Sequence, residues 1–282
     1  RGGFSYNYNE DDVVLDGGPM GQIEKGTHTT FVFENSVSDQ VELRFGAEHI
    51  NISYEASRLD SLSIQQVLKF NNPITAAFME AEAYASKQFV ARAGIRSEYI
   101  GLEEKISIDP RVSVAYKPFE QGQFSLAYGR FRQTPQNQYL RVNNKLAEEV
   151  AEHYILNYQV INNNRTFRTE VYYKKYLKLV KFVNGNPGQL TNSGTGYARG
   201  FELFWRDSES VKNLDYWVSY SYLDTERDYL NFPVTSTPTF ASRHNFSVVG
   251  KRFVSAIKSQ IGITYSYSSP RVYNNPNEEI FN

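Results

Sequence analysis

The sequence predicts an all-β protein: an antiparallel transmembrane β-barrel, built as a meander with short periplasmic turns and long extracellular loops, of which this chain forms a part. Three observations predict it. Apolar and polar side chains alternate along most of the 282 residues, as in strands with one apolar face. Most alternating segments reach the roughly 9–11 residues that a tilted strand needs to cross a bilayer. Short and long connections also alternate, as in a barrel whose long loops all lie at one end.

Composition supports β structure and excludes several other classes. Tyr occurs 21 times and Phe 19 times, and both residues favour strands and polar–apolar interfaces. The absence of cysteine excludes disulfides, thiolate metal sites and a cysteine nucleophile. The 30 basic and 31 acidic residues nearly balance, so no nucleic-acid partner is expected. No apolar run approaches the roughly 18 residues of a membrane-spanning helix, which excludes a helical membrane protein.

The alternation places each strand in turn. We expect strands at residues 1–9, 28–37, 40–56, 74–85, 88–99, 110–117, 122–132, 150–159, 166–177, 197–206, 213–223, 243–253 and 259–269. Short turns then fall near residues 38–39, 86–87, 118–121, 161–165, 207–212 and 254–258. Long loops fall at residues 10–27, 57–73, 100–109, 133–149, 178–196 and 224–242. Only residues 57–70 and 144–153 have a weak helical pattern.

The two faces of a strand are clearest in residues 197–206. Phe201, Leu203 and Trp205 share one side, and Glu202 and Arg206 share the other. In a transmembrane barrel the apolar side meets lipid and the polar side lines the lumen. Outer-membrane lipid is therefore an expected partner, and closure of the complete barrel is required because lipid cannot satisfy a free sheet edge.

The predicted lumen carries charges of both signs in equal number. The lumen-facing candidates of greatest interest are Arg92, Arg96, Glu98, Arg111, Arg168, Glu170, Lys174, Glu202 and Arg206. Glu42, Glu48, Glu80, Glu82 and Arg44 complete the predicted set. A balanced wall suits a lumen filled by a folded plug, where each charge needs a counter-charge. The alternative is a wall of simply solvated charges.

Tyrosines gather toward the long-loop ends of the later strands. Such rings form an aromatic girdle where a barrel crosses the membrane surface. The predicted girdle consists of Tyr172, Tyr173, Tyr220, Tyr222, Tyr265 and Tyr267. The long loops beyond it, at 133–149, 178–196 and 224–242, are the natural ligand-capturing surface. Residues 184–196 are either a mobile lid or a disordered loop.

No catalytic, cofactor or metal site is predicted. The four histidines, His28, His49, His153 and His244, form none of the usual metal-binding spacings and are expected at interfaces and strand ends. Ser242, His244 and Asn245 are neighbours in sequence, which is no evidence for a catalytic triad. We therefore expect a protein that is not an enzyme.

Several segments in succession resemble one known family. PRVSVAYKPFEQGQFSLAYGRFRQTPQ (110–136) resembles the barrel of TonB-dependent outer-membrane receptors, especially those of Bacteroidetes. EEVAEHYILNYQ (148–159) is similar to an acidic strand of that family, although Asn157 stands where glycine is usual. The family's order continues in RTEVYYKKYLKLV (168–180), GYARGFELFWR (196–206), YWVSYSYLDTER (216–227), RHNFSVVGKRF (243–253) and IGITYSYSSPRVYN (261–274).

The resemblance implies a bacterial outer-membrane transporter that imports a scarce ligand, such as an iron chelate, cobalamin or a glycan. It implies two protein partners: the energy-coupling TonB system and a plug domain of the same protein. Residues 1–282 are expected to be a single barrel domain from the middle and later part of a barrel of about 22 strands, without the plug. A passive porin or structural barrel is the alternative, and a soluble β-rich binding module is a further one.

Overall fold

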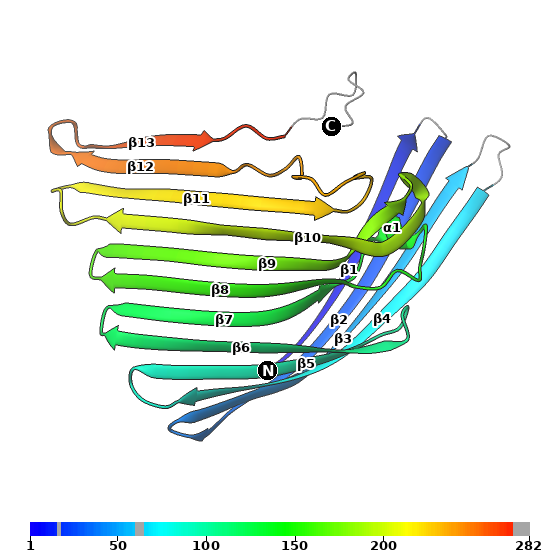
Figure 1. Ribbon diagram of the computed structural model, residues 1–282, viewed down its shortest axis with the longest axis horizontal. Coiled ribbons are helices and arrows are strands. Elements are labelled where there is room, and N and C mark those ends of the chain that lie inside the picture. Colours follow the sequence, from blue (N-terminus) through cyan, green and yellow to red (C-terminus); the bar gives the residue numbers. More distant parts are fainter. Residues whose placement is uncertain (16–17, 60–64, 273–282) are drawn as a thin grey trace.

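The computed structural model describes residues 1–15, 18–59 and 65–272, which form one antiparallel sheet of thirteen strands in sequential order (Figure 1). The strands are β1 (Gly2–Leu15), β2 (Gly18–Ser38), β3 (Val41–Leu59), β4 (Gln65–Tyr84), β5 (Phe89–Ile100), β6 (Lys105–Phe119), β7 (Gly122–Gln133), β8 (Glu149–Asn162), β9 (Arg165–Val183), β10 (Asn186–Asp207), β11 (Leu214–Asp228), β12 (His244–Val254) and β13 (Ser259–Ser268). Two short helices, α1 (Asn137–Leu140) and η1 (Ser255–Ile257), lie in connections. The predicted all-β meander is confirmed.

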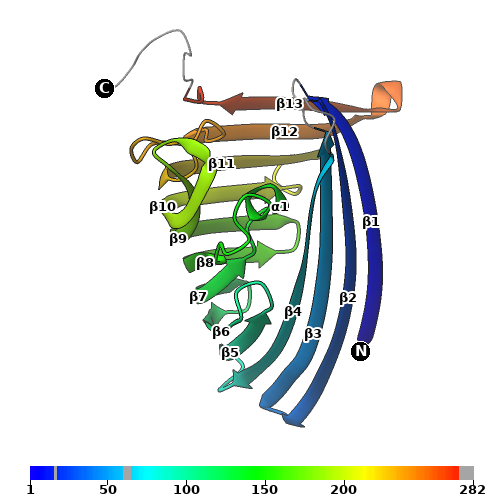
Figure 2. The same cartoon turned by 90° about the vertical axis from the view of Figure 1, so that its right-hand side faces the viewer.

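The sheet curls into a trough. Strands β1–β4 form one wall and the later strands form the other, with α1 between them (Figure 2). Within the described residues β1 and β13 are the two edges of the sheet and do not pair with each other, so the sheet is part of a barrel rather than a closed one. In the same residues no helix has the length and apolar character needed to cross a bilayer.

Cross-strand register decides which side chains share a face, because directly opposed residues point the same way. One row of opposed residues passes from Glu34 on β2 through Arg44, Glu80 and Arg111 to Lys174 on β9. The neighbouring row, one residue away along each strand and therefore on the opposite face, holds Phe33, Phe45, Met79 and Ile95 on β2–β5. The polar and apolar faces are therefore continuous across the sheet, as the alternation predicts.

The polar face is the concave one. The loop between β7 and β8, which carries α1, reaches across the trough to the opposite wall. Asn137 Nδ2 donates a hydrogen bond to Glu24 on β2 at 2.5 Å, and Leu140 packs in a cluster with Tyr54 of β3. Glu24 and Tyr54 are directly opposed, and each lies an even number of residues from the opposed pair Glu34 and Arg44. They are therefore on the same, polar face, and the loop contacts that face.

The convex face exposes large apolar side chains. Phe31 is 64% exposed and Phe33 is 66% exposed, and the same face carries Met79 at 57% and Val171 at 54%. Contiguous apolar surface of this extent is rare on a soluble monomer and marks contact with another apolar phase. In a barrel strand that phase is the hydrocarbon of the membrane.

Short turns at the end opposite the long loops are closed by residues suited to tight backbone geometry. Asn163 and Asn213 adopt left-handed φ values of 46° and 61°, which asparagine tolerates better than most residues. Between β10 and β11, Asp207 Oδ1 accepts the N–H groups of Glu209 and Ser210, both at 2.8 Å. These bonds fix the hairpin ends and hence the register.

Most of the predicted long loops are wrong in extent. Residues 10–15 and 18–27 extend β1 and β2, and β10 begins at Asn186 inside the predicted loop 178–196. Their polar composition resembles a loop, but an antiparallel hairpin beyond the membrane needs only backbone pairing and no apolar face. Register shifts between residues 186 and 195 absorb the irregular Asn- and Gly-rich sequence.

Both weak helical predictions are also wrong. Residues 57–59 and 65–70 belong to β3 and β4, while residues 60–64 lie outside the described residues. Residues 149–153 begin β8, and the short helix α1 lies upstream at Asn137–Leu140. Pairing with neighbouring strands outweighs a weak local helical pattern in each case.

The face assignment predicts a sharp difference between two adjacent positions on β11. Val218 shares the apolar face with Trp205 and Val248, whereas Ser219 opposes Phe204 and Ser247 on the polar face. Val218→Arg is expected to lower the free energy of unfolding in a lipid bilayer by about 2–4 kcal/mol, because it places a charge in hydrocarbon. Denaturant titration of the refolded receptor measures this. Ser219→Arg is the matched control and should have little effect; equal losses would contradict the assignment.

Candidate functional site

The candidate site is the concave wall of the trough, and all nine lumen-facing candidates lie on it. Arg96 opposes Asp109, Lys174 opposes His153, and Glu170 opposes Glu202. The register puts the remaining candidates on this same face: Arg92, Glu98, Arg111, Arg168 and Arg206. Charge does not spread evenly along this wall, which divides into regions of different chemistry.

The first region, on β2–β5, is a network of ion pairs that we call the paired wall. Arg96 Nη2 lies 2.5 Å from Glu48 Oε2 and 2.6 Å from Glu98 Oε1. Arg92 contacts both Glu82 and Glu80. Arg44 Nε lies 3.4 Å from Glu34 Oε1. The carboxylates and guanidinium groups of this region therefore neutralise one another across strands, and the wall presents little unbalanced charge.

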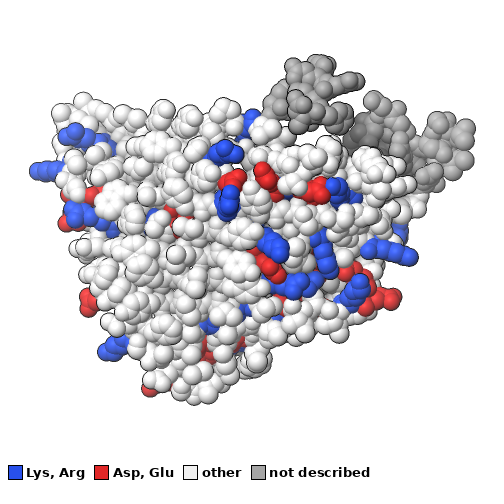
Figure 3. All heavy atoms as spheres, in the orientation of Figure 1, with Lys and Arg blue, Asp and Glu red and all other residues white. Residues whose placement is uncertain are grey.

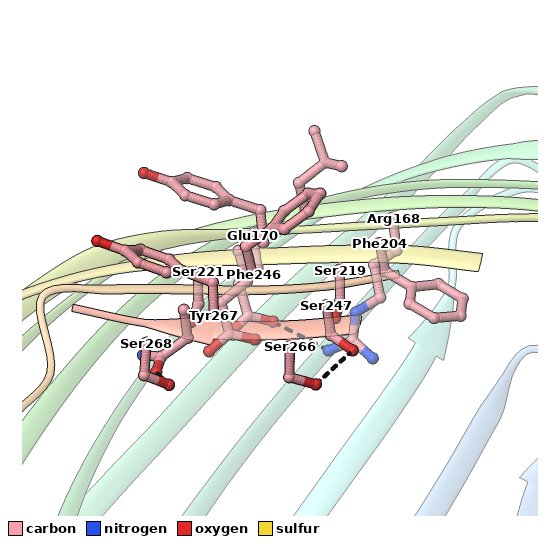
Figure 4. A pocket seen from close by; sticks show the side chains of 14 residues that line it. Arg168, Glu170, Phe204, Ser219, Ser221, Phe246, Ser247, Ser266, Tyr267 and Ser268 are labelled. Carbon is pink, nitrogen blue, oxygen red and sulfur yellow. Dashed lines mark hydrogen bonds and ion pairs between the residues drawn. The ribbon is translucent and has the colours of Figure 1, made fainter. Parts of the chain in front are cut away.

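The second region is a hydroxyl-lined hollow of about 670 Å³ on β9–β13, shown in Figure 4. Its polar floor consists of Ser219, Ser221, Asn245, Ser247, Ser266 and Ser268. Ser268 Oγ donates to Asn245 Oδ1 at 2.8 Å, and the hydroxyls of Ser247 and Ser266 lie 3.3 Å apart. Arg168 pairs with Glu170 at 3.1 Å at the edge of the hollow.

The third region is the outer rim, where the α1 loop closes over the long-loop ends of the strands. Leu140 and Leu146 from this loop pack with Tyr54, Phe70, Val180 and Leu190, which joins β3 and β4 to β9 and β10. Together these residues form one cluster of buried apolar side chains. The predicted loop 133–149 is therefore a packed element that connects the two walls.

A carboxylate is buried beneath this loop. Glu148 is 4% exposed, and its Oε2 has no hydrogen-bond partner in the described structure. Arg132 Nη1 lies 3.9 Å from that oxygen, but Arg132 Nε already donates to Asp109 at 2.9 Å. Burial and the nearby carboxylates of Glu98 and Glu103 raise the pKa of Glu148 to about 7, so it titrates near neutral pH.

The predicted girdle needs one change. Tyr173, Tyr220, Tyr222, Tyr265 and Tyr267 share the convex face. Tyr172 instead lies on the concave face opposite Gly200 and Ile155, because adjacent residues of a strand point to opposite sides.

Two further tyrosines complete a row that the sequence analysis missed. Tyr128, Tyr154 and Tyr173 are opposed on β7, β8 and β9, with ring centroids 5.0 Å and 6.2 Å apart. The sequence shows that each tyrosine lies on the apolar side of its own strand. Their alignment into one row depends on the register between strands, which the sequence does not show. Tyr128 and Tyr154 are therefore added to the girdle candidates.

The histidines each have a structural partner. His28 Nε2 lies 2.6 Å from Glu48, His49 Nδ1 lies 2.9 Å from Thr75, and His244 Nδ1 lies 2.8 Å from Tyr220. The His153 ring packs against the Phe131 ring in a tilted arrangement, with ring centroids 4.7 Å apart. In the described ranges no group of three or more His, Cys, Asp or Glu side chains is placed to hold a metal ion. Ser242 Oγ donates to the main-chain oxygen of Ser269 at 2.9 Å, not to an imidazole.

Comparisons with known proteins agree with this architecture. A family model described as "TonB dependent receptor-like, beta-barrel" matches residues 1–281. No curated protein matches the chain by sequence.

Among solved structures, the chain is similar to the FrpB iron transporter from Neisseria meningitidis (F5-1 variant), with a TM-score of 0.70 and 13% identity over 87% of this chain and 44% of that one. It is similar to the outer membrane transporter YddB from Escherichia coli, with a TM-score of 0.72 and 12% identity over 93% of this chain and 45% of that one. It is also similar to the siderophore receptor PiuA from Acinetobacter baumannii, with a TM-score of 0.65 and 11% identity over 89% of this chain and 47% of that one. The chain thus spans less than half the length of each of these relatives, and at these identities the likeness is one of fold.

The buried carboxylate at the rim predicts a pH dependence. Because the pKa of Glu148 is raised in the folded state, ionisation opposes the packed loop, and the loop should loosen as pH rises from about 5 through about 7. Glu148→Gln removes the charge and should abolish that change. Hydrogen exchange of residues 134–150 at pH 5 and pH 8 measures it. Glu152→Gln on the convex face of β8 is the control; a pH response that persists in Glu148→Gln would contradict the assignment.

Proposed function

Because the chain belongs to the TonB-dependent receptor β-barrel family, whose barrels lie in the outer membrane of Gram-negative bacteria, we propose that it forms part of the wall and ligand-binding rim of an energy-coupled importer. The family-model match over residues 1–281 is the observation that carries this proposal. Family members are transporters and receptors rather than enzymes.

The proposed ligand is a scarce nutrient such as an iron chelate, cobalamin or a glycan. Similar structures include an iron transporter and a siderophore receptor, which supports an iron chelate most directly. The proposed protein partners are the TonB system and the plug domain of the same protein, and the proposed partner of the convex face is outer-membrane lipid. The single-domain organisation of residues 1–282 stays a prediction, as do the lumen and girdle roles of the residues named above.

The paired wall supports a lumen that receives a folded plug. Arg96 is held between two carboxylates on different strands, Glu48 and Glu98, and its side chain is 19% exposed. Such a network is rigid and nearly neutral, and a protein surface can pack on it without burying an unpaired charge. A passive porin would need an open, water-filled lumen instead.

Energy coupling gives the direct test. Uptake of the native ligand by cells that express the full-length receptor should fall to background when TonB is deleted or the proton-motive force is collapsed. Radiolabelled nutrients measured in wild-type and TonB-deficient cells provide the readout, and a general porin substrate is the control. Uptake that persists without TonB, together with steady single-channel conductance in a planar bilayer, would establish the passive barrel instead.

A further inference from the structure

The pairing between β6 and β7 stops before either strand ends. The last opposed pair toward the long-loop end is Arg111 and Gly129, and no described residue beyond it joins the two strands in the ladder. Both strands nevertheless continue outward, because β6 stays paired with β5 and β7 stays paired with β8 as far as their ends. Residues 105–110 and 130–133 therefore border a split in the sheet, which we call the outer seam.

The position of Pro110 explains why the ladder ends there. The N–H of Lys117 donates to the main-chain oxygen of Gln88, just before β5, at 2.7 Å. Backbone groups alternate in direction along an antiparallel strand, so those of Pro110, an odd number of residues away, point toward β7. The next hydrogen-bonded pair of the ladder would join Pro110 to Arg130. Proline has no N–H to donate, and the pairing therefore ends at this residue.

Charged side chains, rather than backbone groups, hold the outer seam closed. Arg132 Nε on β7 donates to Asp109 Oδ1 on β6 at 2.9 Å and to Oδ2 at 3.0 Å. Arg130 Nε lies 3.8 Å from the same Oδ1, and the Asp109 side chain is only 3% exposed. In the α1 loop, the N–H of Glu148 donates to Glu103 Oε1, in the connection between β5 and β6, at 2.6 Å.

Two charged groups of this cluster lack a hydrogen bond in the closed seam. Arg130 Nε and Glu148 Oε2 are both buried without a hydrogen-bond partner in the described structure. Their distances of 3.8 Å to Asp109 and 3.9 Å to Arg132 are too long for hydrogen bonds. A buried charged group without hydrogen bonds is destabilising, and access to water would remove that cost. The ion pair that favours closure is thus opposed by groups that favour hydration.

We propose that the outer seam is a moving part of the barrel wall, where the outer ends of β6 and β7 separate and rejoin and the ion pair of Asp109 with Arg132 holds them together. This inference goes beyond the import function and depends on no particular ligand. Tyr128, at the inner end of the seam, is a girdle candidate. The seam thus lies outward of the proposed girdle, where water and lipid headgroups can bind unpaired backbone groups. An open seam hydrates the buried charges and joins the lumen to the membrane surface beside the barrel.

The test places two nitroxide labels across the seam of the full-length receptor in lipid nanodiscs. Residues 1–282 contain no cysteine, so Lys105→Cys and Gln133→Cys give one labelled pair once any cysteine elsewhere in the receptor is changed to serine. Both positions are exposed. Dipolar broadening of the electron paramagnetic resonance spectrum reports the label separation, and the seam should give a broadened, closed component and an unbroadened, open one. Val114→Cys and Leu126→Cys, opposed in the intact ladder, form the control pair and should give the broadened component alone.

Three substitutions then change the seam or its control in the labelled receptor. Asp109→Asn should lower the closed-to-open ratio by about tenfold, because it removes the charge from the hydrogen bonds with Arg132. Pro110→Ala restores an N–H at the end of the ladder and should raise that ratio, also when combined with Asp109→Asn. Asp215→Asn is the matched control and should leave the ratio unchanged. Asp215 accepts hydrogen bonds from Arg206 at 3.0 Å and 2.8 Å across β10 and β11, which stay paired to the end of β10.

Four results would overturn the proposal. The first is a single fixed separation of the seam labels in every variant. The second is equal opening of the seam in Asp215→Asn. The third is an open fraction that Pro110→Ala leaves unchanged, since the missing N–H would then not govern the seam. The fourth is loss of broadening at the Val114 and Leu126 control pair in Asp109→Asn, which would reveal a general loss of strand pairing in place of a local opening.

Discussion

The structure depends on one constraint: each strand must satisfy its backbone hydrogen bonds through its two neighbours while its side chains meet two different environments. Hydrocarbon offers no partner for a free N–H or C=O group, so pairing must continue from strand to strand. Because side chains alternate with a period of two, a slip of one residue would exchange the two faces of a strand. One continuous row of opposed residues runs from Glu34 on β2 to Lys174 on β9, so no such slip occurs between these strands.

The two faces then follow different rules. On the convex face, Phe31 and Phe33 remain largely exposed and need only an apolar surrounding. On the concave face, charges must be neutralised, solvated or offered to a ligand. On the side of the molecule that Figure 3 shows, basic and acidic groups lie next to one another in several places, with broad uncharged surface between them. The ion pairs of the paired wall and the hydroxyl groups of the hollow on β9–β13 are two different arrangements of polar side chains on one continuous sheet.

Beyond the membrane a strand no longer needs one apolar face, so apolar and polar residues need not alternate there. The strands continue as hairpins whose polar sequences resemble loops, as residues 186–196 of β10 illustrate. Stability there comes from a separate cluster, in which Leu140 of the α1 loop packs against Tyr54 and Val180 from opposite walls. The buried Glu148 follows Leu146 of this cluster by two residues, so a titratable group lies in the loop that joins the two walls.

The sequence by itself determined the strand order, the approximate position of each strand and the face of the residues it assigned other than Tyr172, because alternation is a local property of a strand. It also contained the information that Tyr172 and Tyr173 must point to opposite sides, although the tyrosine cluster obscured it. Tertiary structure decided which strands extend past the membrane and which charges meet. Arg96 binds Glu48 across 48 residues of sequence, and Arg227 stacks on Tyr176 of another strand. Such contacts depend on the register and curvature of the sheet, which no single strand specifies.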